Sequence, residues 1–295
     1  MPKTPELDHI GLYVNSLNAA AAQYERMGFT LTSVSQHSSQ NLDSGEVTLS
    51  GVANRCAMLA KGYLELVCIV DPALDPRGVA AGLARYEGLH IVAMRTWQAE
   101  AACATLQAQG FDAALGDLRR TLDTPTGPQV ARFTQVRTPP AALPEATVFM
   151  LRHETPELLW QPEQLTHPNG AQSLDEVWLC VPDAQLPAAA ARYSRYLGAA
   201  AQPDTHGGVY FPLAHGVLRL LTPAGLAQVA PGASPPLPAD VPWPAGYVVG
   251  VRDLAHTAAV LRTADVAFTD APDRLTVLPA QAAGACLIFR ASAAA

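Results

Sequence analysis

Two titratable residues lie inside apolar stretches in which a polar side chain needs a partner. His9 is part of LDHIGLYV (residues 7–14), and Glu65 is part of YLELVCIV (residues 63–70). Both stretches have the residue pattern of strands. A buried, unpaired carboxylate would cost several kcal/mol, so Glu65 requires a cation, a hydrogen-bond donor or solvent. An imidazole and a carboxylate can ligate a metal or move protons, whereas a hydrogen-bonded strand histidine and a carboxylate in a wet pocket are the simpler interpretations.

The elements that would position these residues recur four times along the chain. The first unit has a strand at 7–14, a helix through SLNAAAAQYERM that ends at Gly28, and strands at FTLTSVSQ, RCAMLA and YLELVCIV. The same order starts again at LHIVAMR (89–95), LDEVWLCV (174–181) and GYVVGVR (246–252). Internal repetition is stronger evidence on architecture than local propensity. We therefore predict an α+β fold of four βαβββ units.

Four such units, the first opening with LDHIGLYV, resemble the vicinal oxygen chelate superfamily of glyoxalase I, extradiol dioxygenases and bleomycin-resistance proteins. More closely, DHIGLYV, GVANRCAMLAKGYLELVCIVDP and VFMLRHETP…HPNG resemble the bacterial glyoxalase-like domain family. The resemblance covers nearly the whole chain and is strongest over residues 5–175. It implies that units pair into half-open barrels, so we expect one barrel at 1–165 and a second at 172–295.

In this superfamily, metal ligands project from the first and last strands of the paired units. Superposing the units matches His9 with His90 and with Glu176, and it matches Glu65 with Arg219. Units one and two then present His9, Glu65 and His90. Two imidazoles and one carboxylate suit Fe²⁺, and Mn²⁺, Ni²⁺ or Zn²⁺ would also fit such a set. The set departs from glyoxalase I, which usually has four ligands, and from extradiol dioxygenases, which carry their ligands in the second pair of units.

Other side chains are candidates for contacting a substrate. Asn54 and Arg55 match an NR motif of the family, and Arg55 could bind a substrate carboxylate bidentately or form a surface ion pair. His153 could serve as a general acid or base, and so could Glu65 if it leaves the metal. The predicted substrate-binding residues are Tyr13, Asn54, Arg55, Arg132 and Phe149.

The second pair of units predicts an ion pair in place of a metal. Glu176 and Arg219 occupy the positions of His9 and Glu65, on strands that neighbour each other in the superfamily. We expect a charge-assisted hydrogen bond of about 2.7–3.2 Å between them. The second barrel would then be a degenerate copy that covers the first pocket or forms an oligomer interface.

Composition narrows the functional classes. Hydrophobic residues make up 49% of the 295 residues and charged residues 15%, which is typical of a globular protein. The net charge of −7 provides no basic stripe for nucleic acid or an anionic membrane. The start of the sequence has no signal-peptide pattern, and the five cysteines are isolated in apolar segments. These features predict a cytoplasmic protein with reduced thiols.

We therefore expect a metal-dependent lyase, isomerase or dioxygenase that acts on a small oxygen-rich metabolite chelated through vicinal oxygens. The alternative is a non-catalytic protein that binds a small molecule in the same concavity, as bleomycin-resistance proteins do. An aromatic content of 6% argues mildly against a clamp for large planar ligands. Besides this small molecule, the partner left open by the sequence is a second copy of the chain in a homodimer.

Overall fold

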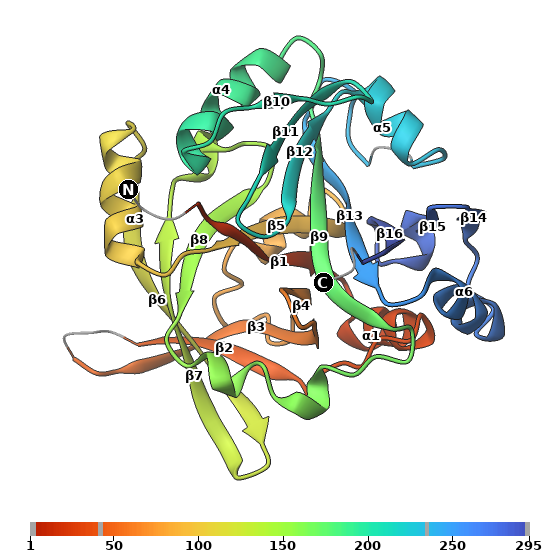
Figure 1. Cartoon of the computed structure of the whole chain (residues 1–295). Helices are drawn as coiled ribbons and strands as arrows, with labels where there is room; N and C mark the ends of the chain where they lie inside the picture. The colour runs from red at the N-terminus through yellow and green to blue at the C-terminus, as the bar shows by residue number, and fades with distance from the viewer. Residues whose placement is uncertain (1–3, 41–43, 234–235, 293–295) are drawn as a thin grey trace.

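The computed structural model of the protein describes residues 4–40, 44–233 and 236–292 (Figure 1). Its elements follow the predicted βαβββ order four times. Unit one contains β1 (Glu6–Tyr13), α1 (Leu17–Arg26), β2 (Ser35–Gln40), β3 (Val47–Met58) and β4 (Tyr63–Ile69). Unit two contains β5 (Gly88–Arg95), α3 (Ala99–Ala108), β6 (Ala114–Thr124), β7 (Gly127–Arg137) and β8 (Thr147–His153). A short helix, α2 (Val79–Leu83), connects these two units.

The second half repeats the order with shorter outer strands. Unit three contains β9 (Ala171–Cys180), α4 (Leu186–Leu197), β10 (Gln202–Pro203), β11 (Gly208–Pro212) and β12 (Val217–Leu221). Unit four contains β13 (Trp243–Val251), α6 (Leu254–Thr263), β14 (Thr269–Ala271), β15 (Arg274–Val277) and β16 (Cys286–Ala291). Between them lies α5 (Pro223–Val229). None of the described helices is long and apolar enough to cross a membrane.

The two halves differ in closure, which corrects the expectation of two half-open barrels. Strands β1 to β8 form a closed barrel in the order β1-β4-β3-β2-β6-β7-β8-β5, whereas β9 to β16 form an open eight-stranded sheet. Closure depends on β2, which pairs with β6 at His37 and Arg120. The equivalent outer strands of the second half, β10 and β14, have only 2 and 3 residues. They lie at opposite edges of the open sheet.

The first strands of the two sheets, β1 and β9, pack against each other through their apolar faces. The opposite face of β1 lines the interior of the barrel, where the candidate site lies. Ile10 and Leu12 of β1 share one buried apolar cluster with Val177 and Leu179 of β9. Side chains alternate along a strand, so His9 and Tyr13 of β1 face the opposite way, into the barrel. Figure 1 shows the first strands of the two sheets crossing at the centre of the molecule.

Candidate functional site

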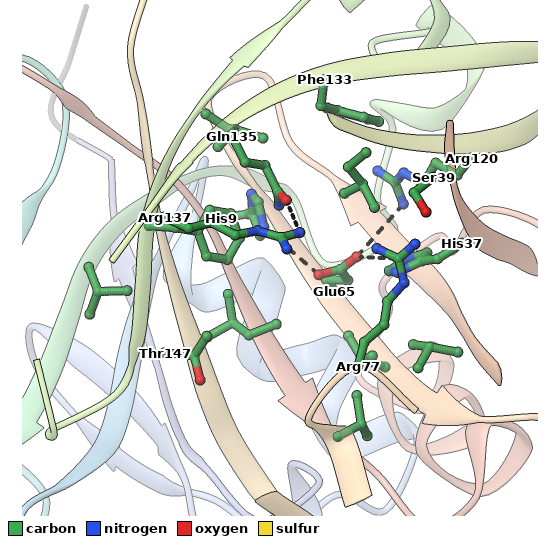
Figure 2. Close-up of a pocket in the computed structure, with 18 of the residues that line it drawn as sticks. His9, His37, Ser39, Glu65, Arg77, Arg120, Phe133, Gln135, Arg137 and Thr147 are labelled. Atoms are coloured by element: carbon green, nitrogen blue, oxygen red, sulfur yellow. Dashed lines mark hydrogen bonds and ion pairs between the residues drawn. The ribbon is translucent and has the colours of Figure 1, made fainter. Parts of the chain in front are cut away.

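The closed barrel surrounds a cavity of about 510 Å³ (Figure 2). Its floor is formed by four buried polar residues that come from β1, β2, β4 and β6, namely His9, His37, Glu65 and Arg120. The walls are largely apolar, and partly exposed charged side chains form the rim. The lining therefore combines a buried polar cluster with apolar surface, as small-molecule sites commonly do.

Glu65 is surrounded by donors that belong to the protein itself. Asn54 donates its side-chain amide to Glu65 Oε1. His37 Nε2 and Arg120 Nη1 lie 3.6 and 3.8 Å from Oε1, and His9 Nε2 lies 3.8 Å from Oε2. Burial alone would raise the pKa of Glu65, but the hydrogen bond with His37 and the nearby charges of His9, His37 and Arg120 hold it at about 2. The carboxylate is therefore ionised at neutral pH, and the partner that the sequence required is a set of side chains.

His9 is oriented by a buried carboxylate on the neighbouring residue. Asp8 Oδ1 lies 2.7 Å from His9 Nδ1, and Asp8 Oδ2 accepts a hydrogen bond of 2.8 Å from Arg95 Nε. Burial opposes ionisation of Asp8, but the charges and hydrogen bonds of His153 and His9 lower its pKa well below the usual value. Asp8 therefore fixes the Nδ1–H tautomer of His9. The ring stacks on Tyr63, with centroids 4.3 Å apart, and turns its Nε2 toward the cavity.

The other predicted acid–base residue, His153, serves the same carboxylate and does not line the cavity. Its Nε2 lies 2.9 Å from Asp8 Oδ2. Burial lowers the pKa of His153, although the negative charge of Asp8 opposes that effect. His153 therefore contacts the carboxylate that orients His9, and its position differs from that expected of a residue in contact with a substrate.

The structure does not bring His90 to His9 and Glu65, which corrects the predicted ligand set. A β-bulge between Gly11 and Leu12 shifts the pairing of β1 with β5, so that Gly11 faces Ile91 and Leu12 faces Leu89. His90 is the extra residue of this bulge, and Ile91 lines the cavity in its place.

His90 has its own partners outside the cavity. Its ring stacks between Tyr13 and Tyr86, with centroids 4.5 and 4.1 Å away, and its Nε2 lies 2.9 Å from the Tyr86 carbonyl oxygen. Burial lowers the pKa of His90 to about 4, although the hydrogen bond to Tyr86 opposes this effect. His90 is therefore a neutral, packed side chain at pH 7.

The remaining residues do not fit the predicted divalent metal. Among the residues that the structure describes, no three His, Cys, Asp or Glu side chains are placed to hold an ion. Asn54 already occupies Glu65 Oε1, and the Arg120 guanidinium, 3.8 Å from the same atom, would repel a cation. The His9–Glu65 pair therefore lacks the third ligand of the predicted Fe²⁺ site, and its carboxylate is already bound by side chains of the protein.

The predicted substrate-binding residues divide into two groups. Tyr13 and Phe149 line the cavity, and Asn54 bonds to the carboxylate at its centre. Arg55 instead forms an ion pair of 2.9 Å with a carboxylate of α1, outside the cavity. Arg132 is exposed and lies on the outer face of β7, because its neighbour Phe133 lines the cavity.

Several residues of the site had not been predicted. Asp8 and His37 belong to it, as do three arginines, Arg77, Arg120 and Arg137. Alternation in QVARFTQVR places Phe133, Gln135 and Arg137 on one face of β7, which is a usable signal for the last of these. The others depend on how the barrel closes, and the sequence has no local pattern that specifies this.

The second half confirms the predicted ion pair. Arg219 donates from Nε to Glu176 Oε2 at 2.7 Å and from Nη2 to Oε1 at 3.2 Å. Arg290 Nη1 also donates to Oε1 at 2.7 Å, and Arg219 forms a further ion pair with Asp204. Burial would raise the pKa of Glu176, but Arg219, Arg290 and the Trp178 indole hold it at about 2.

Comparison with known proteins agrees with this architecture. Residues 7–197 match the family model described as a glyoxalase-like domain. No curated protein matches the sequence significantly. Among solved structures, a hypothetical protein from Staphylococcus aureus superposes with a TM-score of 0.63 at 11% identity, covering 98% of this chain and 100% of the other.

Two other structural neighbours have names that describe an activity. A fusion of a xylose isomerase-like TIM barrel with 4-hydroxyphenylpyruvate dioxygenase superposes with a TM-score of 0.58 at 13% identity, covering 100% of this chain and 50% of the other. A triple mutant of 4-hydroxymandelate synthase from Streptomyces coelicolor gives 0.58 at 14% identity, covering 100% and 95%. At such low identity, these likenesses establish the fold alone.

Proposed function

Because the chain belongs to the glyoxalase-like domain family of the vicinal oxygen chelate superfamily, we propose that its closed barrel is the active site of an enzyme that transfers a proton on a small oxygen-rich metabolite. The observation that carries this proposal is the Asp8–His9 pair. Asp8 is fully buried and holds Nδ1, so that Nε2 presents a lone pair to the cavity. A buried carboxylate that orients a histidine in this way is a common arrangement for general acid–base catalysis.

The side chains of the floor support one sequence of proton movements. His9 Nε2 accepts a proton from a substrate carbon next to a carbonyl group, and the electron pair of the C–H bond moves to the carbonyl oxygen as an enolate. The Arg120 guanidinium lines the same cavity and can stabilise the negative oxygen. In an α-hydroxy carbonyl compound, the hydroxyl proton passes to the enolate oxygen, and return of the proton from Nε2 to the former carbonyl carbon completes an isomerisation. Where the carbon β to the carbonyl carries a leaving group, its departure with the electron pair of the enolate gives an elimination. The Glu65 carboxylate, 3.8 Å from Nε2, stabilises the imidazolium while it exists.

Exchange of substrate protons with solvent tests this proposal directly. The protein is incubated in D₂O with a panel of small α-hydroxy and α-oxo carbonyl compounds, and loss of the Cα–H signals is followed by NMR. We expect exchange with at least one compound, and we expect His9→Gln to slow it by about 100-fold or more. His256→Gln is the matched control, because His256 is exposed and bonds to the Pro168 carbonyl oxygen, far from the barrel interior. Equal exchange in both variants would contradict the role of His9.

Two other outcomes separate this proposal from the alternatives. Compounds that bind without any exchange would identify a non-catalytic binding protein of the bleomycin-resistance type. Elemental analysis of protein purified without chelators, repeated on His9→Gln, tests the metal-dependent form of the enzyme. A near-stoichiometric metal in the parent that is lost in the variant would support that form, with ligands other than His90.

A further inference from the structure

Two arginines at the rim of the cavity lack the carboxylate partners that the buried floor possesses. Arg77 lies in the loop before α2, and Arg137 is the last residue of β7; both line the cavity. In the described part of the chain, neither side chain forms an ion pair. Arg137 donates to the Gln135 side-chain oxygen, and the Nε of Arg77 is buried without a hydrogen-bond partner. Figure 2 shows the two side chains reaching toward Glu65 from either side.

The two guanidinium groups are close enough to repel each other. Burial lowers the pKa of Arg137, and the charge of Arg77 lowers it further. Burial also lowers the pKa of Arg77, which the charge of Asp75 opposes in part. Asp75 also lines the cavity, but it is exposed to solvent, and its carboxylate accepts a hydrogen bond of 2.9 Å from the backbone N–H of Arg77. A protein that holds two such cations together has spare donors for an anion, because guanidinium groups match carboxylate oxygens in geometry.

The floor of the cavity restricts how such an anion can lie. Glu65 is ionised there and lies 3.8 Å from Arg120, the cation that would stabilise the enolate, so a permanently charged carboxylate would be repelled from the depth of the barrel. Between rim and floor, the walls include Val52, Val67, Val79 and Phe133. The lining thus offers donors at the rim, apolar surface in the middle, and an acceptor with a neighbouring imidazole at the floor.

We propose that Arg77 and Arg137 bind the carboxylate of a small organic acid whose apolar body lies against the walls and whose uncharged end reaches His9 and Glu65. This inference rests on the proposed function for the place of the reacting end, and it adds the substrate class. The rim arginines select the acid and set its direction in the barrel. The orientation keeps the carboxylate away from Glu65 and delivers the rest of the molecule to the His9 imidazole.

Binding of acids and of their uncharged amides tests the inference without any need for turnover. Calorimetry at pH 7 compares acetate, phenylacetate and 3-phenylpropionate with the corresponding amides, and with inorganic phosphate. We expect at least one acid to bind about tenfold or more tightly than its amide, because two charge-assisted hydrogen bonds are lost in the amide. Arg77→Gln and Arg137→Gln should each weaken that acid by about tenfold, and the lysine variants should weaken it less.

Arg132→Gln is the matched control, because Arg132 lies on the same strand as Arg137 but on the outer face of the barrel. It should change binding of the acid by less than twofold. Melting temperatures of the variants without ligand show that each one is folded. Failure of every acid to bind better than its amide, or equal binding in the Arg77 and Arg137 variants, would overturn the inference. Phosphate binding more tightly than every acid would replace the organic acid by an inorganic anion and would also overturn it.

The proton-exchange assay separates this inference from the proposed function. Acids that bind through Arg77 and Arg137 but never exchange protons would refute the reaction and leave the acid site standing. Exchange that depends on His9, occurs only with uncharged compounds and is unchanged in the two arginine variants would refute the acid site and leave the reaction standing.

Discussion

Replacing Glu65 by glutamine tests whether the buried floor of the barrel is organised around a negative charge. The substitution changes the size of the side chain little, and the amide oxygen of glutamine can still accept the hydrogen bond from Asn54. What it removes is the charge that His9, His37 and Arg120 surround. Arg120 in particular remains buried with a negative neighbour lost, which is the costly way to disrupt a buried ion pair.

The pKa of Glu65 gives the size of the expected effect. It is held at about 2 in the folded protein, against an ordinary value of 4.5. At about 1.4 kcal/mol for each pH unit, the ionised carboxylate stabilises the folded state by about 3 kcal/mol. Because the folded-state pKa is the lower one, this stabilisation is fully present above pH 4.5 and is lost as the pH falls toward 2. Glu65→Gln should therefore cost about 3 kcal/mol at pH 7 and progressively less in acid.

Urea unfolding at a series of pH values between 7 and 2.5 measures both parts of the prediction. The free energy of unfolding of the parent should approach that of Glu65→Gln as the pH falls below 4.5. Glu157→Gln serves as the control, because Glu157 is exposed on the surface and should behave like the parent protein. A difference at pH 7 below about 1 kcal/mol, or one that stays constant down to pH 2.5, would refute the argument that these partners hold the charge of Glu65.

Two further substitutions test the interpretation of other buried polar residues. Arg219→Leu should cost about 1–3 kcal/mol in urea unfolding, less than removal of an isolated partner, because Glu176 keeps Arg290 at 2.7 Å and Asp204 keeps the His206 backbone N–H at 2.8 Å. A loss above about 5 kcal/mol would mean that these remaining contacts provide no compensation. His90→Phe should flatten the dependence of stability on pH between about 6.5 and 4, because neutral folded His90, with a pKa of about 4, makes the parent less stable as the pH falls through that range. An unchanged slope would contradict the buried, neutral state of His90.

The four repeated units could be predicted because each one depends on residues that are close together in the sequence. Closure of the barrel could not be predicted, because it depends on a contact between distant segments. Each βαβββ unit has its own alternation of apolar residues and its own helix, so four copies are recognisable one at a time. Closure depends on β2 pairing with β6, a contact between His37 and Arg120 across more than 80 residues of sequence. Polar strands such as SQHSSQ have no apolar face that fixes their partner. The same reasoning explains why the short β10 and β14 were expected to form a barrel and instead leave the second sheet open.

The site was predictable where an isolated residue conflicted with its surroundings. Glu65 inside an apolar strand had to have partners, and it has them. Counting residues from one unit to the next failed at His90, because the bulge between Gly11 and Leu12 adds one residue to β5 and turns Ile91 into the barrel. A side chain added to Gly11 would lie 2.8 Å from Ile91 Cδ1, so this close approach requires glycine. A register shift of one residue moves a side chain to the other face of its sheet, and sequence spacing alone does not reveal it.

The two halves of the chain differ in how completely the charges of their polar clusters are paired within the protein. Glu176 and Glu65 are both buried carboxylates with a pKa of about 2. In the second half, Arg219 and Arg290 both donate to Glu176, and Asp204 pairs with Arg219, so each of these charges has its counter-charge within the protein. In the first half, the floor is balanced in the same way, but Arg77 and Arg137 at the rim form no ion pair in the described part of the chain. The guanidinium groups that form no ion pair, on which the proposed acid site rests, therefore line the cavity of the closed barrel and not the open sheet.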